Sequence, residues 1–171
     1  ADLNKIRLQL EKTKIIAERT QQLANNSKPL IANPQNYSNI YEIALEELKQ
    51  YGKEHYGILS DISMPNEPSL VVNQMLAKSG DINIVVNNVG DTLSILDPLC
   101  SLEDWDKLFR LILGVAIEIN NLVIPRMKEK QWGRIVNITA GASMENSGPV
   151  PYCALKAAYT AYTRSLARVL A

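Results

Sequence analysis

The chain has 171 residues, of which 46% are hydrophobic and 21% charged, and this ordinary balance excludes wholesale disorder and fibrous structure. Eighteen Lys and Arg residues offset 18 Asp and Glu residues, so the formal net charge is zero. A chain without excess positive charge lacks a general surface for nucleic acid, and we expect no nucleic-acid partner.

The cysteine and histidine content argues against a metal centre. Cys100 and Cys153 form no CxxC pair and His55 is the single histidine, so we expect no metal site. Two isolated cysteines are typical of the reducing cytoplasm, and the first five residues do not resemble a signal peptide. The longest apolar run, Leu111 to Ile117, is too short to cross a bilayer. We therefore expect a cytoplasmic protein without a membrane segment.

The first part of the chain shows helical patterns separated by a polar stretch. Apolar residues recur among charges over 3–24, which predicts a helix. The Asn- and Pro-rich residues 25–38 predict a loop or insertion, and a second helix is predicted over 40–48. Residues 55–62 then predict a short strand that ends in Ser-Asp-Ile-Ser.

The rest of the chain alternates between helical patterns and β-branched runs. The predicted elements are a helix at 67–79 stopped by Gly80, a strand at 82–86, a helix at roughly 102–128, a strand at 134–139 and a helix at 152–170. Ser101 and Asp104 form a capping box for the long helix, and Pro125 should kink or end its last turn. The alternation predicts one α/β domain with a mostly parallel sheet.

The clearest chemical signal is the segment Tyr152-Cys-Ala-Leu-Lys156. Residues four positions apart share one face of a helix, so the phenol and the ammonium can converge on one point. A nearby cation stabilises the phenolate and lowers the pKa of the tyrosine, which would let Tyr152 exchange a proton with a carbonyl or alcohol oxygen. The same spacing also occurs on ordinary solvated helix faces, so the surrounding sequence has to decide.

Two longer segments supply that context. The sequence GRIVNITAGASMENSGPVPYCALKAAYTAYTRSLARVLA resembles the active-site region of the short-chain dehydrogenase/reductase family, and Asn87-Asn88-Val89-Gly90 resembles its Asn-Asn-Ala-Gly motif. These motifs, the helix at Trp105 and the strand RIVNIT follow the family order over most of residues 57–171. The resemblance implies an α/β fold of the Rossmann-like type, a doubly wound parallel sheet with helices on both faces.

The resemblance also implies roles for individual residues. Tyr152 is the expected acid/base of an NAD(H)-dependent oxidoreductase that interconverts an alcohol and a ketone or other carbonyl, and Lys156 is expected to bind the nicotinamide ribose and to lower the pKa of the tyrosine. The other expected cofactor contacts are Asp61 at the adenine edge with Ile62 beside it, then Asn88, Val89 and Gly90 along the adenosine ribose, and Ile138. Asn87 and Asn88 also suit a purely structural role as caps that fix the strand end.

Asp2 bears on the choice between cofactors. Ala-Asp-Leu-Asn resembles the end of the family's second strand, where an acidic residue accepts hydrogen bonds from the adenosine ribose. A carboxylate there repels a 2′-phosphate, which favours NAD over NADP. Asp2 would serve equally as the N-cap of a helix that begins near Leu3, and the residues alone leave both roles open.

Two expected catalytic positions depart from the family. The serine that orients the substrate oxygen aligns with Ala140, which has no hydroxyl. Thr139 or Ser143 is then expected to substitute, or the step is impaired, although Ser143 is also typical of an ordinary loop. The asparagine that supports a proton relay aligns with Ile112, which can only pack. The alternative function is therefore a catalytically weakened member that binds nucleotide or serves as a subunit.

The family's first strand and its glycine-rich turn, which holds the pyrophosphate at a helix N-terminus, are absent from these residues, and only eight glycines occur. We therefore expect the sequence to be the middle of a longer chain. In the family, the helices equivalent to 102–128 and 152–170 pack against a neighbouring subunit, which implies a homodimer or homotetramer. Their simpler role is to cover the sheet.

Overall fold

The computed structural model describes residues 42, 43, 45, 46, 48, 49 and 55–171. The chain divides into two compact units, residues 1–59 and residues 60–171. In the first unit, the described residues between 42 and 49 are helical, as the sequence predicts. Asp2, the predicted helix at 3–24 and the predicted loop at 25–38 lie outside the described residues, and the single-domain organisation stays a prediction.

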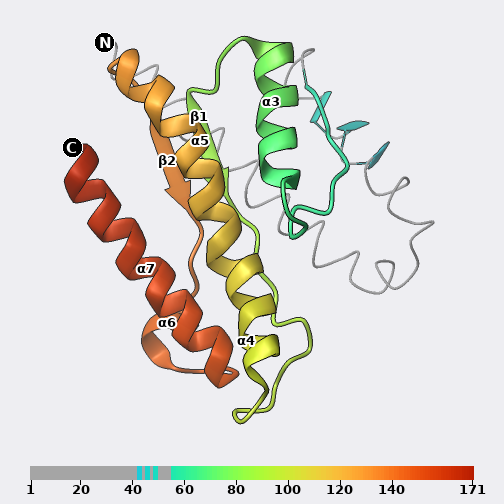
Figure 1. Ribbon diagram of the computed structural model, residues 1–171, viewed down its shortest axis with the longest axis vertical. Helices are drawn as coiled ribbons and strands as arrows, with labels where there is room; N and C mark the ends of the chain where they lie inside the picture. Colours follow the sequence, from blue (N-terminus) through green and yellow to red (C-terminus); the bar gives the residue numbers. More distant parts are fainter. Residues whose placement is uncertain (1–41, 44, 47, 50–54) are drawn as a thin grey trace. The chain divides into compact units, whose positions relative to one another are not determined.

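The second unit combines two parallel strands with several helices (Figure 1). Its elements are α3 (Glu67–Ser79), β1 (Ile84–Asn87), α4 (Leu102–Phe109), η1 (Arg110–Gly114), α5 (Val115–Glu129), β2 (Arg134–Asn137), α6 (Ala142–Glu145) and α7 (Val150–Leu170). β1 and β2 pair in parallel, with Ile84 opposite Arg134 and Asn87 opposite Asn137. The predicted α/β class is confirmed.

Two helix boundaries lie at the residues that the sequence indicates, and a third does not. α3 ends where Gly80 adopts a φ of 74°, a conformation that suits glycine at a helix C-terminus. Ser101 Oγ accepts a hydrogen bond of 3.2 Å from the Asp104 N–H and so caps α4. Pro125 does not end the long helix, because α5 continues to Glu129.

The predicted strand at 55–62 is wrong. Residues 55–61 have no regular secondary structure, and the chain then turns, with the Met64 N–H bonded to the Asp61 carbonyl at 3.0 Å. A strand needs a neighbouring strand for its backbone donors and acceptors. Within the described residues, the sheet consists of β1 and β2, and this segment is not one of its strands.

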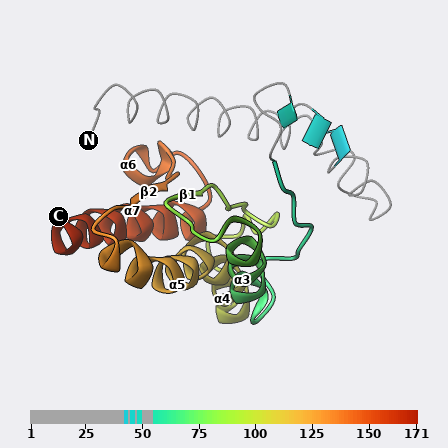
Figure 2. The ribbon, with the colours of Figure 1, turned by 90° about the horizontal axis from the view of Figure 1, so that it is seen from above.

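The helices α3, α5 and α7 lie on the same side of the two strands (Figure 2). Val72 of α3 joins Val123 and Met127 of α5 in one buried cluster, against which the strand residues Val85 and Ile135 pack. α7 joins α5 through a second cluster centred on Tyr159. The described residues therefore show one helical layer of the doubly wound arrangement.

The continuous helix from Leu102 to Glu129 is long and apolar enough to cross a membrane by length and composition alone. Its apolar side chains pack against α3, against the strands and against α7. The core helix of a water-soluble fold has the same length and composition, and these contacts are those of a core helix.

Candidate active site

The first two turns of α7 carry the predicted tyrosine and lysine. The Lys156 side chain is buried, with the residue 4% exposed, whereas Tyr152 is half-buried. Lys156 Nζ lies 5.7 Å from the centroid of the Tyr152 ring and 5.7 Å from that of the Tyr159 ring. The helical spacing thus brings the phenol and the ammonium to one place, as the sequence predicts.

The ends of both strands converge on Lys156. Its Nζ donates a hydrogen bond of 3.2 Å to the carbonyl of Ile138, which directly follows β2. From the side of β1, a Cβ placed on Gly90 would lie 2.9 Å from Nζ and 3.4 Å from Cε. A side chain at position 90 would displace the Lys156 ammonium, and the φ of 157° at Gly90 also favours glycine there. The carboxyl ends of parallel strands are where α/β sheets bind their ligands.

The polar groups of Lys156 and Tyr152 fit the ribose and the substrate of a nicotinamide-dependent reaction. An ammonium has three donors, and among the described residues Lys156 uses one of them, on Ile138. The others are available for ribose hydroxyls. The Tyr152 hydroxyl, for its part, has no hydrogen-bond partner within the described part of the chain, so it is available to a substrate oxygen.

Burial controls the acid–base properties of the pair. Burial lowers the pKa of the Lys156 ammonium. Burial also raises the pKa of the Tyr152 hydroxyl, and the negative charge of Asp91 raises it further. The expected lowering of this tyrosine pKa is therefore wrong, because burial and Asp91 raise the pKa instead. The physical reason is that Tyr152 packs against the apolar cluster of Leu108, Ile112 and Leu155.

The two candidate substitutes for the missing serine differ in their surroundings. Ser143 Oγ donates a hydrogen bond of 2.7 Å to the Ala140 carbonyl and lies 3.4 Å from Thr160 Oγ1. Its hydroxyl is thus engaged at the start of α6. Thr139 is half-buried, and its hydroxyl has no partner among the residues that the structure describes. Both catalytic roles stay predictions, and the free hydroxyl favours Thr139.

Ile112 lies in the π-helical turn η1, which the sequence did not indicate. The residue is 1% exposed and packs with Leu108 and Leu155. Its Cγ1 atom would lie 4.0 Å from a Cβ on Gly90, so it forms part of the wall beside Lys156. The position that we expect to align with the family's proton relay therefore holds a buried aliphatic side chain.

Replacement of Ile112 by asparagine is expected to destabilise the protein by about 3 kcal/mol, because it buries an amide in an apolar cluster and loses packing. The corresponding fall in melting temperature is roughly 6–12 °C. Thermal unfolding followed by circular dichroism would measure it, with Ile112→Val as the matched control that keeps the site apolar. An unchanged melting temperature would mean that the amide finds partners there.

The predicted adenine contacts lie elsewhere in the second unit, in the turn before α3. Asp61 is exposed, and its Oδ1 accepts hydrogen bonds from the Ser63 N–H at 3.1 Å and from Ser63 Oγ at 2.6 Å. Ile62 beside it is half-buried. Asn88 and Val89, also half-buried, connect β1 to Gly90. These cofactor roles stay predictions, and Asp2 lies outside the described residues.

A buried polar network links the strand ends to the helices, and the sequence analysis missed it. The Asn87 amide donates to Asn120 Oδ1 at 3.0 Å and to Asn137 Oδ1 at 2.8 Å. Asn137 Oδ1 also accepts from the Tyr159 hydroxyl at 3.1 Å. This network fixes the strand ends next to Ile138, the residue that binds Lys156. Asn120, a polar residue on an apolar helix face, is the signal that could have revealed it.

A hollow of about 540 Å³ lies away from this site, between the end of α5, β2 and the end of α7. Trp132, Gly133 and Leu170 are among its lining residues, and none of the predicted site residues is. Within the described part of the chain, no group of three His, Cys, Asp or Glu residues is placed to hold a metal ion.

Comparison with known proteins places this site in a family. The family profile described as short chain dehydrogenase matches residues 17–171. The 3-oxoacyl-[acyl-carrier-protein] reductase FabG of Staphylococcus epidermidis is 27% identical over 151 residues, which cover 88% of this chain and 62% of that protein. The Pseudomonas aeruginosa protein of the same name is 32% identical over 124 residues, 72% of this chain and 50% of its own length. The chain thus spans 50–62% of these curated relatives.

The fold has a solved counterpart as well. The structure of a 7α-hydroxysteroid dehydrogenase complexed with NADH and 7-oxo glycochenodeoxycholic acid matches with a TM-score of 0.70 and 25% sequence identity. The match covers 77% of this chain and 52% of that one. Since the family profile covers far more than half of the chain and a dehydrogenase shares its fold, this protein belongs to the short-chain dehydrogenase family.

Proposed function

We propose that the protein, in its full-length form, is a nicotinamide-dependent oxidoreductase that interconverts an alcohol and a carbonyl in a small molecule. The observation that carries this proposal is the convergence of Tyr152, Lys156 and Gly90 at the carboxyl ends of β1 and β2. The curated relatives named as reductases and the structural neighbour named as a dehydrogenase support the same class of reaction.

The chemistry divides between the cofactor and two side chains. A bound nicotinamide supplies or accepts a hydride at the substrate carbon. In the direction of reduction, the Tyr152 hydroxyl donates its proton to the carbonyl oxygen, and in oxidation the phenolate takes the proton from the alcohol. Lys156 holds the ribose hydroxyls and offsets the charge of the phenolate once that charge forms. The raised pKa of Tyr152 keeps it protonated near neutral pH, the state that reduction requires.

The proposed cofactor is NAD(H) rather than NADP(H), because the carboxylate of Asp2 is expected beside the adenosine ribose. We expect the full-length protein to bind NADH at least tenfold more tightly than NADPH, as measured by calorimetric titration of both. The Asp2→Ala variant should narrow the difference, since it removes the repulsion of the 2′-phosphate. Equal affinities would overturn the preference, and failure to bind either dinucleotide would overturn the proposed function.

A second candidate function is a weakened family member that binds nucleotide or serves as a subunit. Three observations favour it. Ala140 offers no hydroxyl, Ile112 is a buried aliphatic residue, and Ser143 Oγ is engaged by the Ala140 carbonyl. An alcohol and carbonyl panel with the full-length protein separates the two functions. The weakened member would bind the dinucleotide and turn over none of the substrates.

The expected assembly and location remain proposals. We propose a homodimer or homotetramer built through the long helix (Leu102–Glu129) and α7, and a cytoplasmic location. Small side chains on the exposed face of α7, namely Ala154, Ala158, Ala161 and Ser165, would let another helix approach closely.

A further inference from the structure

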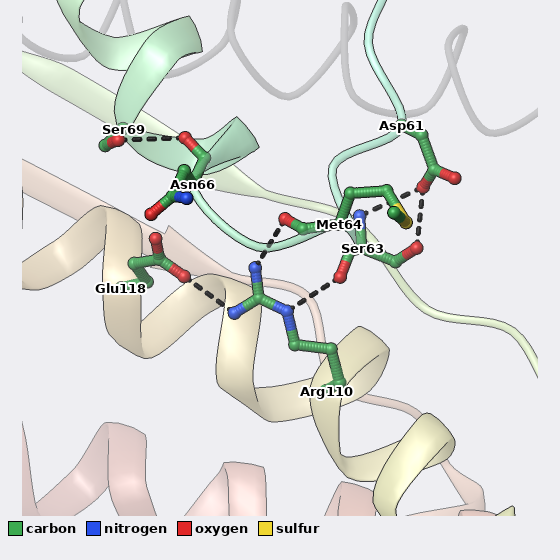
Figure 3. A network of polar contacts seen from close by, with 7 residues as sticks. All are labelled: Asp61, Ser63, Met64, Asn66, Ser69, Arg110 and Glu118. Atoms are coloured by element: carbon green, nitrogen blue, oxygen red, sulfur yellow. Dashed lines mark hydrogen bonds and ion pairs between the residues drawn. The ribbon is translucent and has the colours of Figure 1, made fainter.

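A single arginine connects the long helix to the turn that contains Asp61 (Figure 3). Arg110 Nε donates a hydrogen bond of 2.8 Å to the Ser63 carbonyl, and Nη2 donates one of 3.0 Å to the Met64 carbonyl. These two acceptors are consecutive in the chain, yet they lie 46 and 47 residues from Arg110. Arg110 thus holds the backbone of a turn that is remote in sequence.

The turn itself is organised around the Asp61 carboxylate. Asp61 Oδ1 accepts both the backbone and the hydroxyl hydrogen bonds of Ser63. Both bonds end on Oδ1. Among the described residues nothing bonds Oδ2, so this oxygen is free to accept a hydrogen bond from a ligand. The direction in which it points depends on the backbone of Ser63 and Met64, which Arg110 holds.

Glu118 keeps the arginine in place. Its Oε2 lies 2.6 Å from Arg110 Nη1, and both side chains are about two-thirds covered, with 29% and 32% of their surfaces exposed. Arg110 therefore directs three nitrogens to three separate oxygens. A planar guanidinium can hold such a set in one fixed geometry, whereas a lysine ammonium binds as a single point.

The position of Arg110 in the helix adds a connection to the catalytic pair. Arg110 is the first residue of the π-helical turn η1, and Ile112 of the same turn lies beside Gly90 and packs with Leu155 of α7. Residues of η1 therefore contact both the Asp61 turn and the wall of the Lys156 site.

We propose that Arg110 is a positioning residue that sets the Asp61–Met64 turn for the adenine end of the dinucleotide. This inference rests on the proposed function, because it takes the ligand to be a nicotinamide dinucleotide. Arg110 does not touch the cofactor. It acts through the main chain of Ser63 and Met64, and Glu118 orients it.

The test compares the full-length protein with its Arg110→Met variant in the binding of two probes, NADH and reduced nicotinamide mononucleotide, which lacks the adenosine half. We expect the variant to raise the Kd for NADH about tenfold, because charged hydrogen bonds that fix the turn are lost. The Kd for the mononucleotide should stay within twofold. Arg126→Met is the matched control, since Arg126 also lies on the long helix and bonds a carbonyl, that of Gly80 at 3.5 Å.

Two further variants keep the test decisive if Arg110→Met does not fold. Arg110→Lys keeps the positive charge but removes the planar guanidinium that bonds three oxygens at once. Glu118→Gln keeps the arginine but removes its ionic partner. Each should raise the Kd for NADH by about threefold and spare the mononucleotide. An unchanged Kd for NADH, or equal losses for both probes, would overturn the inference. Failure of the unmodified protein to bind NADH and NADPH would instead overturn the proposed function on which it rests.

Discussion

Replacement of Tyr152 by phenylalanine is expected to lower kcat by about 10³-fold while the Kd for the dinucleotide stays within twofold. In the proposed mechanism the phenol exchanges a proton with the substrate oxygen, and loss of a positioned acid typically costs 10²- to 10⁴-fold. Phenylalanine keeps the ring that packs against Leu108, Ile112 and Leu155, so the fold and the cofactor site are preserved. Steady-state kinetics and calorimetric titration of the same preparation would measure both quantities.

The pH dependence of the unmodified protein gives this prediction a second readout. In the proposed mechanism, reduction uses the protonated Tyr152 hydroxyl, so its rate should stay constant through neutral pH and fall as the pH rises through the raised pKa of Tyr152. Oxidation requires the phenolate, so its rate should rise over the same alkaline range. The Tyr152→Phe variant should show neither change. If that variant kept its activity and still showed the rate change at alkaline pH, Tyr152 would not be the acid/base.

Replacement of Thr139 by valine is expected to lower kcat by about 10²-fold if Thr139 takes the place of the missing serine, since the hydroxyl proposed to orient the substrate oxygen is then lost. Valine has nearly the same shape, so the variant isolates the hydroxyl. Ala140→Ser, introduced into the Thr139→Val variant, should restore most of the activity because it places a hydroxyl at the family position. Turnover of an alcohol and carbonyl panel would measure these effects, with the Kd for the dinucleotide as the control for an intact site.

The opposite response of these variants would support the alternative function, a catalytically weakened family member. In that case Thr139→Val would change nothing, and Ala140→Ser alone would produce a large gain in rate. Ser143 is the remaining alternative, and its hydroxyl would have to leave the Ala140 carbonyl to reach a substrate. Thr139→Val and Ala140→Ser, each tested alone, therefore show whether Thr139 replaces the family's serine hydroxyl or whether the protein lacks such a hydroxyl.

The sequence predicted the local features of this fold with good accuracy. The helix at 67–79 and its end at Gly80 match α3, and the capping box at Ser101 and Asp104 begins α4. The strands at 82–86 and 134–139 overlap β1 and β2 and are parallel. Each of these predictions depends on side chains a few residues apart, whose relative positions a helix or strand sets by itself.

The same reason explains why Tyr152 and Lys156 could be paired from the sequence. Their spacing of four residues places them on one helix face whatever surrounds that helix. The pKa of Tyr152 was predicted in the wrong direction because it depends on what packs against the ring. That packing comes from Leu108 and Ile112, which lie about forty residues earlier in the sequence.

The sequence by itself determined the family, the alternation of helices with parallel strands and the tyrosine–lysine pair, since all of these are encoded in short motifs and local periodicity. The tertiary structure alone decided the contacts between distant segments. These are the approach of Gly90 to Lys156, the asparagine network of Asn87, Asn120 and Asn137, and the bonds from Arg110 to the Asp61 turn. Such contacts depend on how the helices pack on the strands, because folding brings together donors and acceptors that no sequence spacing relates.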